Sequence, residues 1–178
     1  MTKKIIDLIF EVDNNFSLLN SDDCNWFNFF NTIINSGSNR INVYVVLKQD
    51  YGLENIKSFA TKFKRKIDYK NISFCQYVLP IDIEKNQIDL VSLKDNKKVY
   101  IDNDNTIFFT TSKEVIEVLY MQNIFSVFLN IDVNKYDEKE NKQIYKMSNI
   151  FITSKEISKY SYESINYEFL TFLEKNEN

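Results

Sequence analysis

The chain has 178 residues, of which 44% are hydrophobic and 26% charged, so it has the length and composition of one globular domain. Its formal net charge of −3 argues against general nucleic-acid binding, because nucleic-acid-binding domains are usually basic. Histidine is absent and only two glycines occur, which excludes Ser-His-Asp catalysis, histidine metal sites and glycine-rich phosphate loops. We find neither a signal peptide nor a run of about 20 apolar residues, and therefore expect a cytoplasmic protein without a membrane span.

Short apolar stretches alternate with stretches of helical spacing along the first part of the chain. Residues 5–12 and 41–47 are apolar, which is typical of buried strands. Between them, apolar residues from 26 to 34 recur at helical spacing, and Ser36-Gly37-Ser38 indicates the end of that helix. Residues 54–67 have the clearest amphipathic pattern of the chain and predict a second helix.

The alternation continues after a third predicted strand at 72–79, with one interruption. Residues 85–103 are predicted to contain a small β-hairpin, in which 88–93 pair with 98–101. The later elements resume the strand-and-helix order: strand 106–110, helix 113–122, strand 124–131, helix 138–147, strand 149–152 and a closing helix.

This order of elements predicts the fold class. Apolar strands that alternate with helices indicate a parallel sheet covered on both faces, and right-handed crossovers wind such a chain in two directions. We therefore expect a Rossmann-like, doubly wound α/β fold with a mostly parallel sheet, helices on both faces and a hairpin excursion near 85–103. No domain boundary is predicted, so residues 1–178 form a single domain.

Two similar segments each combine an apolar strand with the residues Thr-Ser-Lys-Glu. They span residues 107–115 and 150–157. Ligands of open α/β sheets bind outside the carboxyl ends of the strands, where these turns are expected. The candidate ligand-binding residues are therefore Thr111, Ser112, Thr153 and Ser154. Ordinary helix capping by serine or threonine is the alternative explanation.

Asp13 and Asp132 each follow a predicted strand and are the candidate catalytic residues. A carboxylate at the rim of the sheet can act as a general base or orient a sugar hydroxyl. The alternative is a solvated loop aspartate or a helix cap. No metal site and no cofactor are predicted.

Asp102-Asn103-Asp104-Asn105-Thr106 resembles the nucleophile motif of haloacid-dehalogenase-like phosphatases. In that family the first aspartate attacks phosphate and shares Mg²⁺ with the second, so the resemblance implies a divergent phosphatase. Asn105 replaces the usual glycine, and the same residues also fit a polar end of the hairpin.

The segment from Thr106 to Ile157 resembles the second half of the N-terminal, acceptor-side domain of GT-B glycosyltransferases. It combines a strand and Thr-Ser turn, a helix, a strand ending in Asn-Ile-Asp, and a later strand that leads into Thr-Ser. The resemblance implies a Rossmann-like, acceptor-binding domain. The residues expected to face its cleft are Asp13, Asp132, Ser112 and Ser154.

The nucleotide-sugar-binding domain of that family has no counterpart in this sequence. The resemblance therefore implies that a second, nucleotide-sugar-binding subunit is the partner. The alternative function is a non-catalytic α/β protein-interaction module, of the type found in mobile elements or phages, whose partner is another protein. The sequence leaves open whether the chain is an enzyme.

Overall fold

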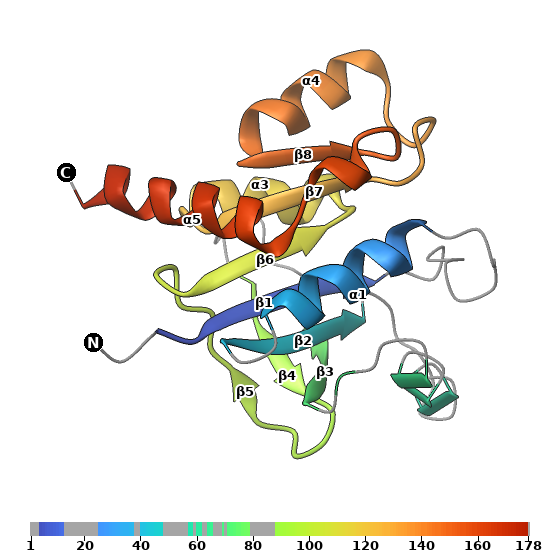
Figure 1. Cartoon of the computed structure of the whole chain (residues 1–178), viewed down its shortest axis with the longest axis vertical. Helices are drawn as coiled ribbons and strands as arrows, with labels where there is room; N and C mark the ends of the chain where they lie inside the picture. The colour runs from blue at the N-terminus through green and yellow to red at the C-terminus, as the bar shows by residue number, and fades with distance from the viewer. Residues whose placement is uncertain are drawn as a thin grey trace.

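The computed structural model describes residues 4–12, 25–37, 40–47, 57–58, 60–61, 64–65, 69, 71–78 and 88–177. Within these residues, one mixed sheet of eight strands is flanked by helices (Figure 1). The elements are, in chain order, β1 (Ile6–Val12), α1 (Asn25–Gly37), β2 (Ile41–Leu47), β3 (Ile72–Tyr77), β4 (Leu90–Ser92), β5 (Lys98–Val99), β6 (Thr106–Thr110), α3 (Lys113–Met121), β7 (Phe125–Asn130), α4 (Glu138–Met147), β8 (Ile150–Thr153), the 3-10 helix η2 (Ile157–Lys159) and α5 (Tyr162–Asn176).

The strand order of the sheet is β5-β4-β3-β2-β1-β6-β7-β8. The pairs among β3, β2, β1, β6, β7 and β8 are parallel, whereas β4 and β5 pair in antiparallel fashion at one edge. The chain thus places β2 and β3 on one side of β1, and β6, β7 and β8 on the other. This mostly parallel α/β sheet is consistent with a Rossmann-like fold.

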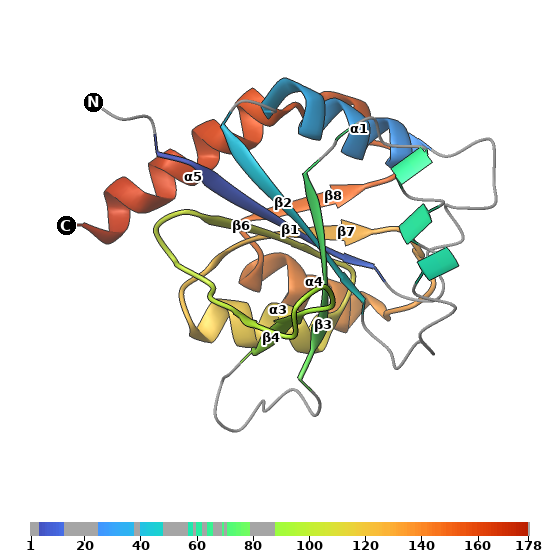
Figure 2. The ribbon, with the colours of Figure 1, turned by 90° about the horizontal axis from the view of Figure 1, so that it is seen from below.

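Helices cover both faces of the sheet: α1 and α5 lie on one face, and α3 and α4 on the other (Figure 2). Successive residues of a strand point to opposite faces, so neighbouring apolar residues supply both cores. Phe10 and Phe109 are register partners in β1 and β6, and their rings stack 4.4 Å apart in the core beneath α1. Ile9 and Phe108, one residue earlier, are buried in the core beneath α3.

The predicted elements are confirmed closely within the described residues. The strands at 41–47 and 106–110 and the helix at 138–147 have the expected bounds, and the other described strands differ by one or two residues at their ends. The expected hairpin is formed by β4 and β5, with Asn96 in the left-handed conformation at its turn. Most of the helix predicted at 54–67 lies outside the described residues, although residues 57–58, 60–61 and 64–65 are helical.

Gly37 ends α1 as expected, but for a different physical reason. Among the described residues no glycine has a positive φ, so Gly37 does not adopt the left-handed conformation that ends many helices. A Cβ at this position would come within 3.0 Å of Ile41 and 3.1 Å of Tyr162. Glycine is therefore needed for close packing between α1, β2 and α5.

Among the helices of the described residues, none combines the length and the apolar character that crossing a membrane requires.

Candidate functional site

The candidate site lies at the edge of the sheet where the parallel strands end. Its centre is Glu11, the second-last residue of β1, whose side chain is buried with only 1% exposed. β1 is the strand at which the order of the sheet reverses, since β2 lies on one side and β6 on the other. In open α/β sheets, ligands bind at such a reversal, outside the carboxyl ends of the strands.

Two hydroxyl groups hold the Glu11 carboxyl group from strands on either side of β1. Tyr77, the last residue of β3, reaches across β2 and donates a hydrogen bond of 2.6 Å to Glu11 Oε2. Thr110, the last residue of β6, donates one of 2.7 Å to Glu11 Oε1. Each carboxyl oxygen thus has a donor, which offsets part of the cost of burying this polar group.

The hydroxyl of Tyr77 stays protonated in this environment. Burial raises the pKa of Tyr77 well above its ordinary value, and the charge of Glu11 and the hydrogen bond to it raise the pKa further. A protonated phenol donates to the carboxyl oxygen that faces it, so Tyr77 fixes the orientation of the Glu11 side chain.

The turn between β6 and α3 begins at the same threonine. While Thr110 Oγ1 donates to Glu11, it accepts a hydrogen bond of 3.0 Å from the backbone N–H of Ser112. Ser112 occupies the N-cap position of α3, but its side chain forms no capping hydrogen bond. The side chain of Ser112 is therefore not the helix cap that the alternative explanation requires.

Thr111 carries a polar atom without a partner among the described residues. Thr111 is 6% exposed, and its buried Oγ1 forms no hydrogen bond within that part of the chain. Buried hydroxyl groups are nearly always hydrogen-bonded in native proteins, so each exception needs an explanation. A polar ligand at this edge of the sheet would supply the missing partner.

The loop after β7 holds the β6–α3 turn in place. Tyr136 Oη accepts a hydrogen bond of 3.1 Å from the backbone N–H of Lys113 and donates one of 3.2 Å to the carbonyl of Thr111. Lys135 Nζ donates to the same carbonyl at 3.3 Å, and Lys113 Nζ lies 3.3 Å from Glu140 Oε1 of α4. Hydrogen bonds with Thr110 of its own strand and with the loop after β7 therefore both hold the turn.

Asp132 lies in the exposed loop that follows β7, at the same edge of the sheet. Its Oδ1 accepts a hydrogen bond of 3.0 Å from the backbone N–H of Asn134, which forms a local turn of the Asx type. This contact agrees with the alternative of a loop aspartate. Asp13, the other predicted catalytic residue, lies outside the described residues.

Thr153 and Ser154 lie at the same edge of the sheet, at the end of β8. The structure that follows them differs from the helix that follows Thr111 and Ser112. Thr153 ends β8, and its Oγ1 donates a hydrogen bond of 3.0 Å to Glu156 Oε2. A turn and η2 follow, and α5 begins only at Tyr162. The two similar segments thus share a strand but not the helix after it, and Ser154 is exposed where Ser112 is buried.

Asp102 and Asp104 lie at the opposite edge of the sheet, directly before β6 begins. Asp102 Oδ1 accepts a hydrogen bond of 3.0 Å from the backbone N–H of Asp104, so the pair forms a polar turn. Among the described residues, no group of three or more Cys, Asp or Glu could hold a metal ion. The hydrogen bond agrees with a polar turn before β6, the other interpretation of these residues.

Glu11 and Tyr77 are site residues that were not predicted from the sequence. The signal was present, because Glu11 is an acidic residue near the carboxyl end of a strand that the apolar pattern predicts to be buried. A buried acidic residue needs a partner, and Tyr77 at the end of another predicted strand could supply it. Only the strand order shows that these ends are neighbours.

No family model matches the chain, and a search of curated proteins finds no match.

Proposed function

We propose that the chain is a Rossmann-like domain that binds a hydroxyl-rich ligand at the carboxyl edge of its sheet, as the acceptor-side domain of a GT-B-like glycosyltransferase. The observation that carries this proposal is the buried Glu11 carboxyl group at the reversal of strand order, oriented by Tyr77 and Thr110. A fixed carboxyl group of this kind organises the neighbouring turn, which offers polar atoms to the hydroxyl groups of a ligand.

Each residue has a distinct part in this proposal. Glu11 is a positioning residue, because its hydrogen bond to Thr110 sets the turn that carries Thr111. The unsatisfied Thr111 Oγ1 and the exposed Ser154 contact the ligand, and the exposed Asp132 is the candidate general base.

The proposal also includes the chain path and a partner. A doubly wound path with right-handed crossovers agrees with the strand order and with helices on both faces of the sheet. In a GT-B-like arrangement, a second subunit that binds a nucleotide sugar faces the carboxyl edge. This domain then binds the acceptor, and transfer of the sugar depends on the second subunit.

The test is binding of unmodified saccharides, measured by saturation-transfer NMR on the purified chain. We expect at least one member of a panel of neutral mono- and disaccharides to receive saturation from the wild-type protein. Ser154→Trp places a bulky ring at the exposed end of β8 and should abolish the transfer. Ser73, near the amino end of β3, is also exposed, so Ser73→Trp is the control and should bind normally.

Tyr77→Phe tests the positioning role of Glu11 in the same assay. Without its Oε2 donor the carboxyl group loses its fixed orientation, so saccharide binding should weaken while the protein stays folded. Absence of saturation transfer across the whole panel would contradict the proposal, and so would unchanged binding by Ser154→Trp.

The protein-interaction alternative lacks a surface that favours it among the described residues. Large exposed hydrophobic side chains are spread over several helices and loops, for example Tyr120 in α3, Val133 in the loop after β7 and Tyr145 in α4. Scattered apolar residues are normal on soluble proteins, whereas docking sites present contiguous patches.

A further inference from the structure

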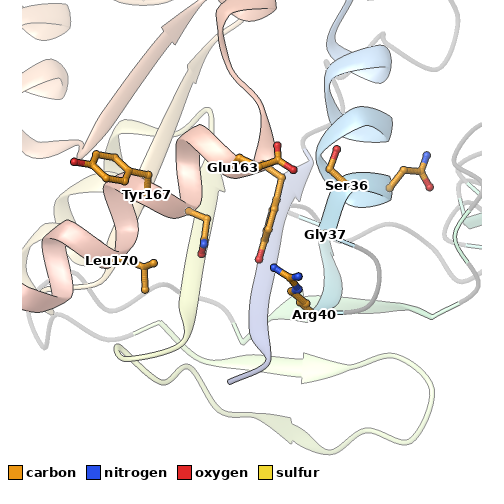
Figure 3. A pocket seen from close by; sticks show the side chains of 9 residues that line it. Ser36, Gly37, Arg40, Glu163, Tyr167 and Leu170 are labelled. Carbon is orange, nitrogen blue, oxygen red and sulfur yellow. The ribbon is translucent and has the colours of Figure 1, made fainter. Parts of the chain in front are cut away.

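A pocket of about 500 Å³ opens at the edge of the sheet opposite the candidate site (Figure 3). It lies between the end of α1, the residue before β2 and the first half of α5. Gly37 and Arg40 line one side, and Tyr162 and Asn166, one helical turn apart in α5, line the other. Two side chains that are four residues apart on an α-helix lie on the same face.

Three polar groups in this pocket have no partner within the part of the chain that the structure describes. Tyr162 as a whole is 4% exposed, and its hydroxyl has no hydrogen bond to a described residue. Asn166 Oδ1 is buried and unsatisfied. The Arg40 guanidinium group forms neither an ion pair nor a hydrogen bond. A buried polar atom costs stability unless it is hydrogen-bonded, and Asn166 Oδ1 is such an atom. Arg40 is exposed, so its guanidinium group is accessible to a ligand in the pocket.

The chemistry of these groups defines the ligand. A guanidinium group presents a planar set of donors that matches a carboxylate or a phosphate. Burial raises the pKa of Tyr162 although the Arg40 charge lowers it, so the hydroxyl remains protonated and is a second donor to an oxyanion. Asn166 Oδ1 is buried beside the pocket and accepts hydrogen bonds, so a rotation of this side chain would let it receive one from a hydroxyl or amine group of the same ligand.

Two further observations concern the charge of the ligand and the cation that binds it. Glu163 also lines the pocket, and its negative charge disfavours a ligand with several anionic groups. Arg40 is one of only two arginines in the chain, which otherwise uses lysine for its positive charges. Figure 3 shows Arg40 extending from the start of β2 toward α5, with Tyr167 and Leu170 farther along that helix.

We propose that this pocket binds a small ligand that carries one oxyanion and neighbouring hydroxyl groups. Arg40 and Tyr162 donate to the oxyanion, and Asn166 accepts from a hydroxyl group. Hydroxy acids and sugar phosphates share this chemistry. The site is separate from the carboxyl edge, because it lies where the strands begin, and it links α1 to α5.

The test uses three probes that differ in one group: glycerol 3-phosphate, glycerate and glycerol. Isothermal titration calorimetry and thermal unfolding are measured for the wild-type chain and for two matched variants, Arg40→Gln and Arg65→Gln. Arg65 is the other arginine and is exposed on the helical residues 64–65. Both substitutions remove the same charge, so only the position differs.

We expect an oxyanion probe to bind the wild-type chain and raise its unfolding temperature, whereas glycerol does neither. Arg40→Gln should weaken binding about tenfold or more, because a charge-assisted hydrogen bond is lost, and Arg65→Gln should leave it unchanged. Tighter binding of glycerol 3-phosphate identifies a phosphate as the ligand group, and tighter binding of glycerate a carboxylate. Binding of neither probe, or equal loss in both variants, would overturn the proposal.

Asn166→Leu provides a second test that a folding defect cannot mimic. This variant removes the unsatisfied buried oxygen, so without probe it should unfold at the same temperature as the wild type or higher. With the probe, its affinity should fall, because the ligand hydroxyl loses its acceptor. Unimpaired binding by Asn166→Leu would show that the pocket does not recognise its ligand in this way.

Discussion

Two acidic residues within β1 differ in the hydrogen bonds that their carboxyl groups accept. Glu11, near the carboxyl end, receives hydrogen bonds from two hydroxyl groups. Asp7, near the amino end, accepts a hydrogen bond of 2.8 Å from an amide group, Asn42 Nδ2. Burial raises the pKa of Asp7, the bond from Asn42 lowers it, and the negative charge of Asp102 raises it. The net result is a raised pKa, so the charged form of Asp7 is unfavourable in the folded protein.

A carboxyl group whose pKa is higher in the folded protein contributes stability only at low pH. That contribution is fully present below the unfolded pKa, about 3.9 for aspartate, and is lost as the pH rises through the folded pKa. Asp7→Asn removes the charge and keeps an oxygen that Asn42 can reach. We therefore expect a higher melting temperature than wild type at pH 7, and a gain that disappears as the pH falls below about 4.

Asp95→Asn is the control, measured by circular dichroism at the same two pH values. Hydrogen bonds from the Ser92 side chain and the Lys97 backbone lower the pKa of Asp95, so its charged form is favoured. Its replacement should lower the melting temperature at pH 7, the opposite sign to Asp7→Asn. An Asp7→Asn gain that is independent of pH would contradict this account.

At the scale of single elements, α3 and α4 begin with different hydrogen bonds to their first backbone N–H groups. α4 begins with a capping box, in which Asp137 and Glu140 satisfy each other's backbone N–H groups. α3 lacks a side-chain cap, and its first backbone N–H group, that of Lys113, is satisfied instead by Tyr136 from the neighbouring loop. The start of α3 thus depends on a tertiary contact.

Tyr136→Phe should therefore loosen the start of α3 without unfolding the protein. It removes the hydroxyl that joins the Lys113 N–H to the Thr111 carbonyl, at a cost of about 1 kcal/mol. Amide hydrogen exchange at Lys113 should become roughly five to ten times faster. Tyr145→Phe alters an exposed tyrosine of α4 and should leave the exchange rate unchanged. Equal exchange rates in wild type and Tyr136→Phe would show that water replaces the hydroxyl.

At the scale of the whole molecule, α5 joins parts of the sheet that are distant in sequence. Its buried face contains Tyr162, Ile165 and Phe169, which lie in the same core as α1 and β7. Phe169 packs edge-to-face against Phe125 of β7, with ring centroids 5.4 Å apart. The last helix therefore completes the core that α1 begins.

Phe169→Ala and Leu170→Ala compare neighbouring residues of α5, one fully buried and the other half-exposed. Phe169 is fully buried, so its truncation should lower the free energy of unfolding by about 3–5 kcal/mol through lost burial and a cavity. Leu170 is 47% exposed, and its truncation should cost about 0.5 kcal/mol or less. Urea denaturation measures both. Similar costs for the two variants would mean that α5 is not anchored by its buried face.

The sequence predicted the elements well because their signals are local. The apolar spacing of β2, β6 and α4 depends on neighbouring residues only, and their bounds agree with the structure. The turns were predicted less well. Ser112 and Ser154 stand in similar local sequences, yet only the first leads directly into an α-helix. At the first of these turns, Tyr136 from another loop accepts a hydrogen bond from the start of the helix, a contact that the local sequence does not predict.

The sequence by itself determined the α/β class, the mostly parallel sheet and the exclusion of histidine chemistry and glycine-rich phosphate loops. These follow from composition and from periodicities that extend over a few residues. The tertiary structure decided the candidate site. Glu11 meets Tyr77 across 66 residues and Thr110 across 99. Such contacts exist only because the strand order brings the ends of β3, β1 and β6 to one edge of the sheet. No local sequence pattern predicts the order in which strands pair.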